Sequence, residues 1–143
     1  MSLPTGQQPA SGAELMRQFL PTSPFVIHLG IQLVDLQPDL AVLALPFSEP
    51  LVTVGATVHG GAIATLIDTA AMVAAWSVAE VPANRRGVTV SLTVTYLAGA
   101  KREDLLALAR VLRRGRSLVY LDVDVKTSSE VAVAKGLVTY KIG

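Results

Sequence analysis

The 143-residue sequence contains no cysteine, only two histidines and almost balanced charge. Without cysteine the chain can form no disulfide, no thiolate metal site and no cysteine nucleophile, and two histidines are too few for most histidine-based metal sites. The formal net charge of +1 gives no reason to expect nucleic acid as a partner, because nucleic-acid-binding proteins gather basic residues. We therefore expect a cytoplasmic protein that needs no metal and no cofactor.

The sequence also lacks a secretion signal and a convincing membrane span. Its amino terminus, "MSLPTGQQPASGAELMRQ", has neither the basic start nor the apolar core of a signal peptide, and we expect residues 1–10 to be a flexible lead-in. The apolar stretch 60–79 is long enough to cross a bilayer, since about 18 residues suffice. It carries Asp68 near its middle, however, where a carboxylate is costly in lipid. A buried helix in a soluble protein is the better interpretation.

The length of the chain and its hydrophobic patterns predict one domain over residues 1–143, with six strands and two helices. Ser11 and Glu14 have the spacing of a capping box and indicate a short surface helix that ends before Pro21. Strands are expected over 31–36 and 40–47, joined by a turn at 37–39. Further strands are expected over 87–100, 105–114, 118–127 and 131–142.

Alternating hydrophobic residues predict which strand faces are buried. In 118–127 the inward residues are Val119, Leu121, Val123 and Val125. In 87–100 the alternation assigns Val88, Val90, Leu92, Val94 and Tyr96 to one buried face, and Thr89, Ser91, Thr93 and Thr95 to the other face.

The helix expected from Gly60 or Gly61 to about Ala79 is apolar nearly all round. Such a helix must be covered on every side. One antiparallel sheet can curl around part of it, and the chain offers no second layer for the rest. A second copy of the molecule could supply that cover.

Asp68 is the one charge in this helix, and the glycines of "VHGG" open it. The first N–H groups of a helix have no intrahelical partner and attract negative charge, so Gly60 and Gly61 could hold a developing oxyanion. Asp68 lies about 10 Å further along the axis, at 1.5 Å per residue. If two copies pack with these helices antiparallel across a two-fold axis, Asp68 of one faces Gly60 of the other. The alternative is that Asp68 hydrogen-bonds only to a nearby Thr or Ser, and that the glycines merely allow close packing.

The stretch "VHGGAIATLIDTAAMVAAW" resembles the helix motif of the hotdog-fold acyl-CoA thioesterases, in particular their phenylacetate-degradation (PaaI-like) branch. The likeness continues through "GVTVSLTVTYLAGA" and "RVLRRGRSLVYLDVDV" and covers about residues 30–142. It implies an α+β hotdog fold, in which a six-stranded antiparallel sheet wraps around one long central helix. It also implies a homodimer or homotetramer.

The resemblance further implies a role for each motif residue. Gly60 would donate its N–H to the thioester oxygen, with His59 beside it. Asp68 of the other subunit would attack the carbonyl or activate water, and Thr89 would help to position that water. Relatives often carry an Asn at the position of Thr53, and losing such a donor costs about 10²–10³ in rate. A protein that only binds acyl-CoA is therefore an alternative.

Other candidates are weaker. Gly61 and Thr53 are expected to border the substrate, and three arginines around a turn could meet the phosphates of coenzyme A: Arg113, Arg114 and Arg116. A solvated turn explains these arginines as well. His28 receives no role, and the absence of a G-x-S-x-G motif argues against a serine hydrolase. We predict a thioesterase acting on a small or medium acyl-CoA or aryl-acyl-CoA, with a hotdog hydratase as a third possibility.

Overall fold

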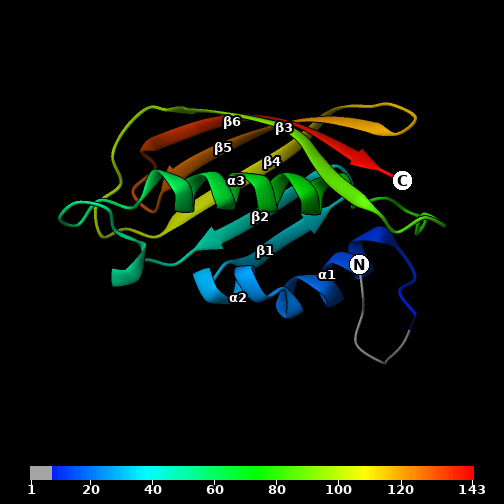
Figure 1. Cartoon of the computed structure of the whole chain (residues 1–143), viewed down its shortest axis with the longest axis horizontal. Helices are drawn as coiled ribbons and strands as arrows, with labels where there is room; N and C mark the ends of the chain where they lie inside the picture. The colour runs from blue at the N-terminus through cyan, green and yellow to red at the C-terminus, as the bar shows by residue number, and fades with distance from the viewer. Residues whose placement is uncertain (1–7) are drawn as a thin grey trace.

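The computed structural model describes residues 8–143 and shows a six-stranded antiparallel sheet that curves around one long helix (Figure 1). Of the predicted lead-in, residues 1–7 lie outside the described part. The strands are β1 Gln32–Gln37, β2 Leu40–Leu45, β3 Gly87–Tyr96, β4 Leu105–Arg114, β5 Leu118–Thr127 and β6 Ala132–Ile142. The long helix is α3, Gly60–Ala75, and short helices precede the sheet. The predicted fold class is confirmed.

The sheet has the strand order β1-β2-β4-β5-β6-β3, so β1 and β3 are its two edges. Its inner face packs on α3 and forms the core. The four residues of β5 predicted to point inward, Val119, Leu121, Val123 and Val125, are each at most 2% exposed. Alternation along a strand therefore identified the core face of β5 correctly.

Helix α3 ends at Ala75, and the predicted end near Ala79 is wrong. Trp76 caps the helix and is fully buried, with its indole N–H donating to the Tyr140 hydroxyl at 2.9 Å. The next residue, Ser77, returns its hydroxyl to the Ala74 carbonyl at 2.6 Å. These contacts turn the chain away from the helix axis before Pro82 is reached. In the described part of the chain no helix is both long and apolar enough to span a membrane.

The amino-terminal helices cover the end of the sheet that carries β1. Helix α1, Gly12–Phe19, starts where predicted, with the Ser11 hydroxyl accepting from the Glu14 N–H at 3.1 Å. It is less superficial than expected, because Leu15 and Met16 are fully buried. A 3₁₀ turn, η1 (Leu20–Thr22), leads into α2, Pro24–Leu29, which was not predicted. Another 3₁₀ turn, η2, spans Glu49–Leu51 before α3.

Edge strand β3 contains a β-bulge that changes which residues point inward. Thr89 pairs with Tyr140 while Ser91 pairs with Thr139, so Val90 is the extra residue. Thr89 therefore faces α3, and its predicted assignment to the opposite face from Leu92 and Val94 is wrong. Val88 and Val90, predicted to be buried, are 58% and 57% exposed. The single chain thus leaves apolar side chains of its outermost strand uncovered.

Candidate active site

Asp68 and Thr89 meet on the inner side of the sheet. Asp68 lies midway along α3, and the bulge in β3 turns Thr89 toward it, so that the Thr89 hydroxyl donates to Asp68 Oδ1 at 2.7 Å. The other carboxylate oxygen, Oδ2, accepts no hydrogen bond from the described residues. The contact satisfies both interpretations of Asp68, as a residue bonded to a threonine and as a carboxylate with one oxygen free for chemistry.

A cavity of about 320 Å³ opens beside this pair. It is lined on one side by α3 and β3 and on the other by the amino-terminal segment. Its apolar wall includes Phe19, Phe25, Val26 and Met72, and Tyr140 lies at the boundary with the core. None of these wall residues was predicted from the sequence. Ser23 before Pro24 and the glycine at position 30 are start and stop signals that would have revealed α2 and hence Phe25.

The amino end of α3 presents one free backbone donor. His59 is the N-cap, and its Nδ1 accepts from the Gly61 N–H at 2.7 Å. The neutral ring therefore carries its proton on Nε2. The Gly60 N–H has no acceptor among residues 8–143, while the Gly60 carbonyl accepts from the Tyr96 hydroxyl at 2.6 Å. Of the two predicted glycine donors, only Gly60 remains available to a ligand.

The two halves of the predicted site do not meet within one chain. A separate cavity of about 200 Å³ borders His59 and Gly61. Phe25 and Thr65 line both cavities, but Asp68 lines only the larger one. The seven-residue separation along α3 places Asp68 about 10 Å from Gly61. One carbonyl cannot contact both Asp68 and the Gly60 N–H of the same chain.

The side of α3 between these two cavities is left open by the sheet. Gly61, Thr65, Asp68 and Met72 recur at helical spacing and form the partly exposed stripe of an otherwise buried helix. Within the described part of the chain, no strand pairs with the outer side of the neighbouring edge strand β3. An unpaired strand edge with exposed apolar side chains is a template for association with another chain.

The three arginines of the β4–β5 turn separate. A bulge between Val111 and Arg113 turns Arg114 to the inner face, where its guanidinium donates to the Ala75 carbonyl at 2.9 Å and to Asp39 at 2.7 Å. Arg114 thus closes the carboxyl end of α3. Arg113 and Arg116 instead line a hollow of about 520 Å³ at the end of the sheet.

The remaining candidates lie outside the Asp68 cavity. Thr53 is exposed in the loop before α3, where its N–H donates to the Thr57 carbonyl at 2.9 Å. His28 is exposed and stacks on Phe25, with ring centroids 6.4 Å apart. Within residues 8–143 no group of three or more acidic or histidine side chains is arranged to hold a metal ion.

Comparison with known proteins identifies relatives that span most of the chain. The Thioesterase superfamily pattern matches residues 55–134, which include His59, Asp68 and Thr89. A Halobacterium salinarum protein provisionally named an esterase is 33% identical over 134 residues, covering 92% of this chain and 88% of the relative. Human acyl-coenzyme A thioesterase 13 is 30% identical over 115 residues, covering 79% of this chain and 80% of the human protein.

Solved structures share the fold over nearly its whole length. A thioesterase family protein from Silicibacter pomeroyi superposes with a TM-score of 0.85 at 25% identity, covering 93% of this chain and 100% of that one. The E. coli PaaI protein of the phenylacetic acid degradation operon has a TM-score of 0.72 at 21% identity, covering 81% and 86%. At 21% identity, the likeness to the PaaI protein shows a shared fold alone. Together they confirm the resemblance on which the expected fold was based.

Proposed function

The chain belongs to the thioesterase superfamily, and on this premise we propose that it hydrolyses the thioester of a small or medium acyl-CoA or aryl-acyl-CoA to the free acid and coenzyme A. One observation carries the proposal. Asp68 is held at one oxygen by Thr89 and lines a cavity on the helix whose first N–H has no acceptor among the described residues. The similarity to an acyl-coenzyme A thioesterase supports the choice of the thioester.

The proposed site is shared between two copies. The open stripe of α3 and the unpaired edge of β3 lie on adjacent elements, and both become covered if two chains associate there with their α3 helices antiparallel. That arrangement brings Asp68 of the partner subunit to the Gly60 end of α3. The positive end of the helix offsets the cost of partly burying the carboxylate. The functional unit is then a homodimer, or a homotetramer built from such dimers.

In the proposed reaction the Gly60 N–H holds the thioester oxygen as the carbonyl becomes tetrahedral. Asp68 of the partner subunit removes a proton from water as the water oxygen bonds to the carbonyl carbon, or attacks that carbon itself. In both routes the carbon–sulfur bond breaks, and the coenzyme A thiolate leaves and is protonated. In the second route water then cleaves the acyl-aspartate anhydride. His59 holds the Gly61 N–H and so shapes this end of the helix. The reaction needs no metal and no redox cofactor.

The deciding variant is Asp68→Asn, which keeps the size of the side chain and its contact with Thr89. We expect unchanged circular dichroism and oligomeric state, with nearly all thiol release from an acyl-CoA panel lost. Glu80→Gln is the matched control, because it removes one exposed carboxylate beyond the end of α3. An Asp68→Asn protein with wild-type turnover would remove this carboxylate from the mechanism.

A second candidate function is binding of acyl-CoA without turnover. It is favoured by Thr53, which stands where relatives often have an Asn and lies exposed in its loop. Thiol-release assays run beside calorimetry with the same acyl-CoA separate the two functions. Tight binding without thiol release would favour the second function.

A further inference from the structure

Four basic side chains without a partner gather at one end of the sheet. Arg86, Arg113, Arg116 and Lys141 make no side-chain hydrogen bond or ion pair with any described residue. Lys101 shares this property but lies elsewhere, in a bridge with Thr57. Of the described cations that lack a partner, all but Lys101 therefore lie at this end of the sheet.

The strand register shows that these residues are neighbours on and around the outer face, away from α3. Leu118 pairs with Lys141, and Lys141 pairs with Val88 on the next strand. Tyr120 pairs with Arg113 and shares the outer face with Leu118, two residues away. The Gly143 N–H donates to the Arg86 carbonyl at 2.8 Å, which adds Arg86 to the same end.

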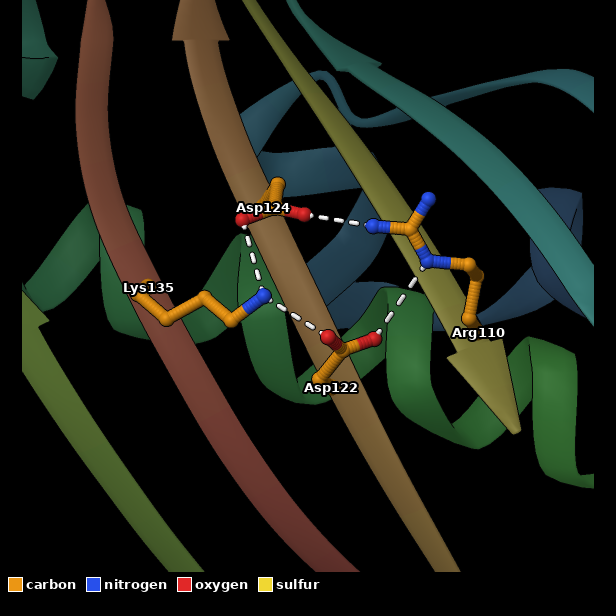
Figure 2. Close-up of polar contacts among 4 residues, drawn as sticks. All are labelled: Arg110, Asp122, Asp124 and Lys135. Carbon is orange, nitrogen blue, oxygen red and sulfur yellow. Dashed lines mark hydrogen bonds and ion pairs between the residues drawn. The ribbon is translucent and has the colours of Figure 1, made fainter. Parts of the chain in front are cut away.

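Cations elsewhere on this face are neutralised. In the middle of the sheet Lys135 lies between two carboxylates, 2.7 Å from Asp122 and 3.0 Å from Asp124, and Arg110 binds the same two from the other side (Figure 2). The contrast between this network and the unpaired end argues against a merely solvated basic surface. A cluster of unpaired cations creates a positive local potential that attracts anions.

The hollow at this end has the chemistry of a nucleotide site. Its volume is about 520 Å³, and its lining includes Arg113, Arg116, Ser117 and Tyr120. Guanidinium groups bind phosphate through two parallel hydrogen bonds. A tyrosine ring that is 39% exposed offers a face on which a base can stack.

We infer that this hollow binds the phosphates and adenine of the coenzyme A carrier, an inference that rests on the proposed function. The Asp68 cavity extends to Gly87 and Val88, directly after Arg86. From Val88 across β6 to Leu118 is about 10 Å, because neighbouring strands lie 4.7–4.9 Å apart. Because Asp68 lies on the inner face and the hollow on the outer face, the pantetheine arm of coenzyme A has to pass around the Gly87 end of β3, which lines the Asp68 cavity. An extended arm that takes this route places the nucleotide over the hollow.

The test compares an acyl-CoA with the same acyl group on N-acetylcysteamine, which lacks the nucleotide. We expect Arg113→Gln and Arg116→Gln each to lower kcat/KM for the acyl-CoA by about 10-fold, mainly through KM, and to leave kcat/KM for the truncated thioester unchanged. Lys126→Gln, which removes one cation from the other end of β5, is the matched control and should change neither. Adenosine 3′,5′-bisphosphate should compete with acyl-CoA in the wild type and at least 10-fold less well in the two variants.

Several results would overturn the inference. Equal losses on both substrates would mean that the arginines act on the fold, and no loss on either would mean that the carrier binds elsewhere. Bisphosphate binding that depends on the arginines but does not compete with acyl-CoA would make the hollow a separate nucleotide site. If the wild type hydrolyses neither thioester, the proposed function fails. Calorimetry of coenzyme A with wild type and variants then still tests the hollow, because equal affinity rejects it.

Discussion

The backbone N–H of Gly60 is the smallest unit on which the proposed chemistry depends. His59 accepts from the Gly61 N–H, so among residues 8–143 the Gly60 N–H is the donor left unpaired at the start of α3. A backbone donor cannot be removed by changing a side chain, with one exception. Proline lacks the N–H and is favoured at the first position of a helix.

We therefore predict that Gly60→Pro removes the donor and preserves the helix. His59 already has φ −61° and ψ 133°, the extended conformation that a residue before proline prefers. The expected result is a loss of kcat of about 10²–10³, measured by thiol release, with helical circular dichroism retained. Both a new proline and a new alanine would bring a Cβ 3.2 Å from the Tyr96 ring.

Gly60→Ala is thus the matched control, because it introduces the same contact and keeps the N–H. An alanine variant as slow as the proline variant would assign the effect to crowding against Tyr96. A proline variant as fast as wild type would mean that the thioester oxygen is held elsewhere.

For single residues, the spacing of the His59–Asp68 motif predicted positions in the structure better than the cluster of arginines near Gly115 did. The spacing from His59 to Asp68 placed one candidate group at the start of α3 and the other midway along it, because helical geometry fixes both positions once the helix is known. Which face of the sheet Arg114 occupies could not be predicted in the same way. A one-residue bulge decides whether it or Arg113 turns inward, and bulges depend on cross-strand packing that a single strand does not encode.

Among the elements, strand boundaries were predicted well where turns are short. The ranges predicted for β4 and β5 agree with the structure to the residue, because Gly115 marks the turn between two alternating segments. Strand β3 was predicted as a strand, but its bulge reversed the faces of its first residues. Helix α2 was missed because its six residues are too short to show helical periodicity.

The link between α3 and β6 gives a prediction about stability and pH. Burial raises the pKa of Tyr140, the hydrogen bond from Trp76 opposes the rise, and the negative charge of Asp68 adds to it. Because the folded pKa lies above the unfolded value of 10.0, this contribution to stability is complete below pH 10.0 and is lost as the pH rises through the folded pKa.

We expect Tyr140→Phe to lower the free energy of unfolding at neutral pH by about 1–3 kcal/mol, since the buried Trp76 N–H loses its acceptor. The difference from wild type should shrink as the pH rises above 10.0, as followed by urea unfolding. The pKa of Lys135 is also raised, chiefly by its hydrogen bond to Asp122. Its deprotonation at high pH lowers the stability of wild type and variant equally, so it cancels from the difference. A difference that stays constant with pH would show that Tyr140 titrates normally.

For the whole molecule, the sequence predicted the architecture because its hydrophobic pattern is consistent along the chain. A helix apolar on nearly all sides and six amphipathic strands leave few ways to bury both. What the pattern could not supply is the surface that covers the stripe of α3 from Gly61 to Met72, because residues 8–143 leave that stripe partly exposed and, on the proposed arrangement, a second copy covers it.

A mixing experiment tests whether two chains build one site. Asp68→Asn and Gly60→Pro chains are each expected to be nearly inactive alone. If they are unfolded, combined and refolded, about half of the dimers will be mixed, and each mixed dimer has one complete site of two. We therefore predict recovery of about a quarter of the wild-type activity per chain. No recovery from folded, mixed dimers would confine the reaction to one chain.

The exposed valines of β3, Val88 and Val90, imply that activity depends on the concentration of the protein. On the proposed arrangement a newly synthesised monomer is inactive until it dimerises. At concentrations below the dimer dissociation constant, total activity would therefore rise more steeply than the protein concentration. Dilution alone would then inactivate the enzyme by dissociating the dimer, with no inhibitor and no chemical modification.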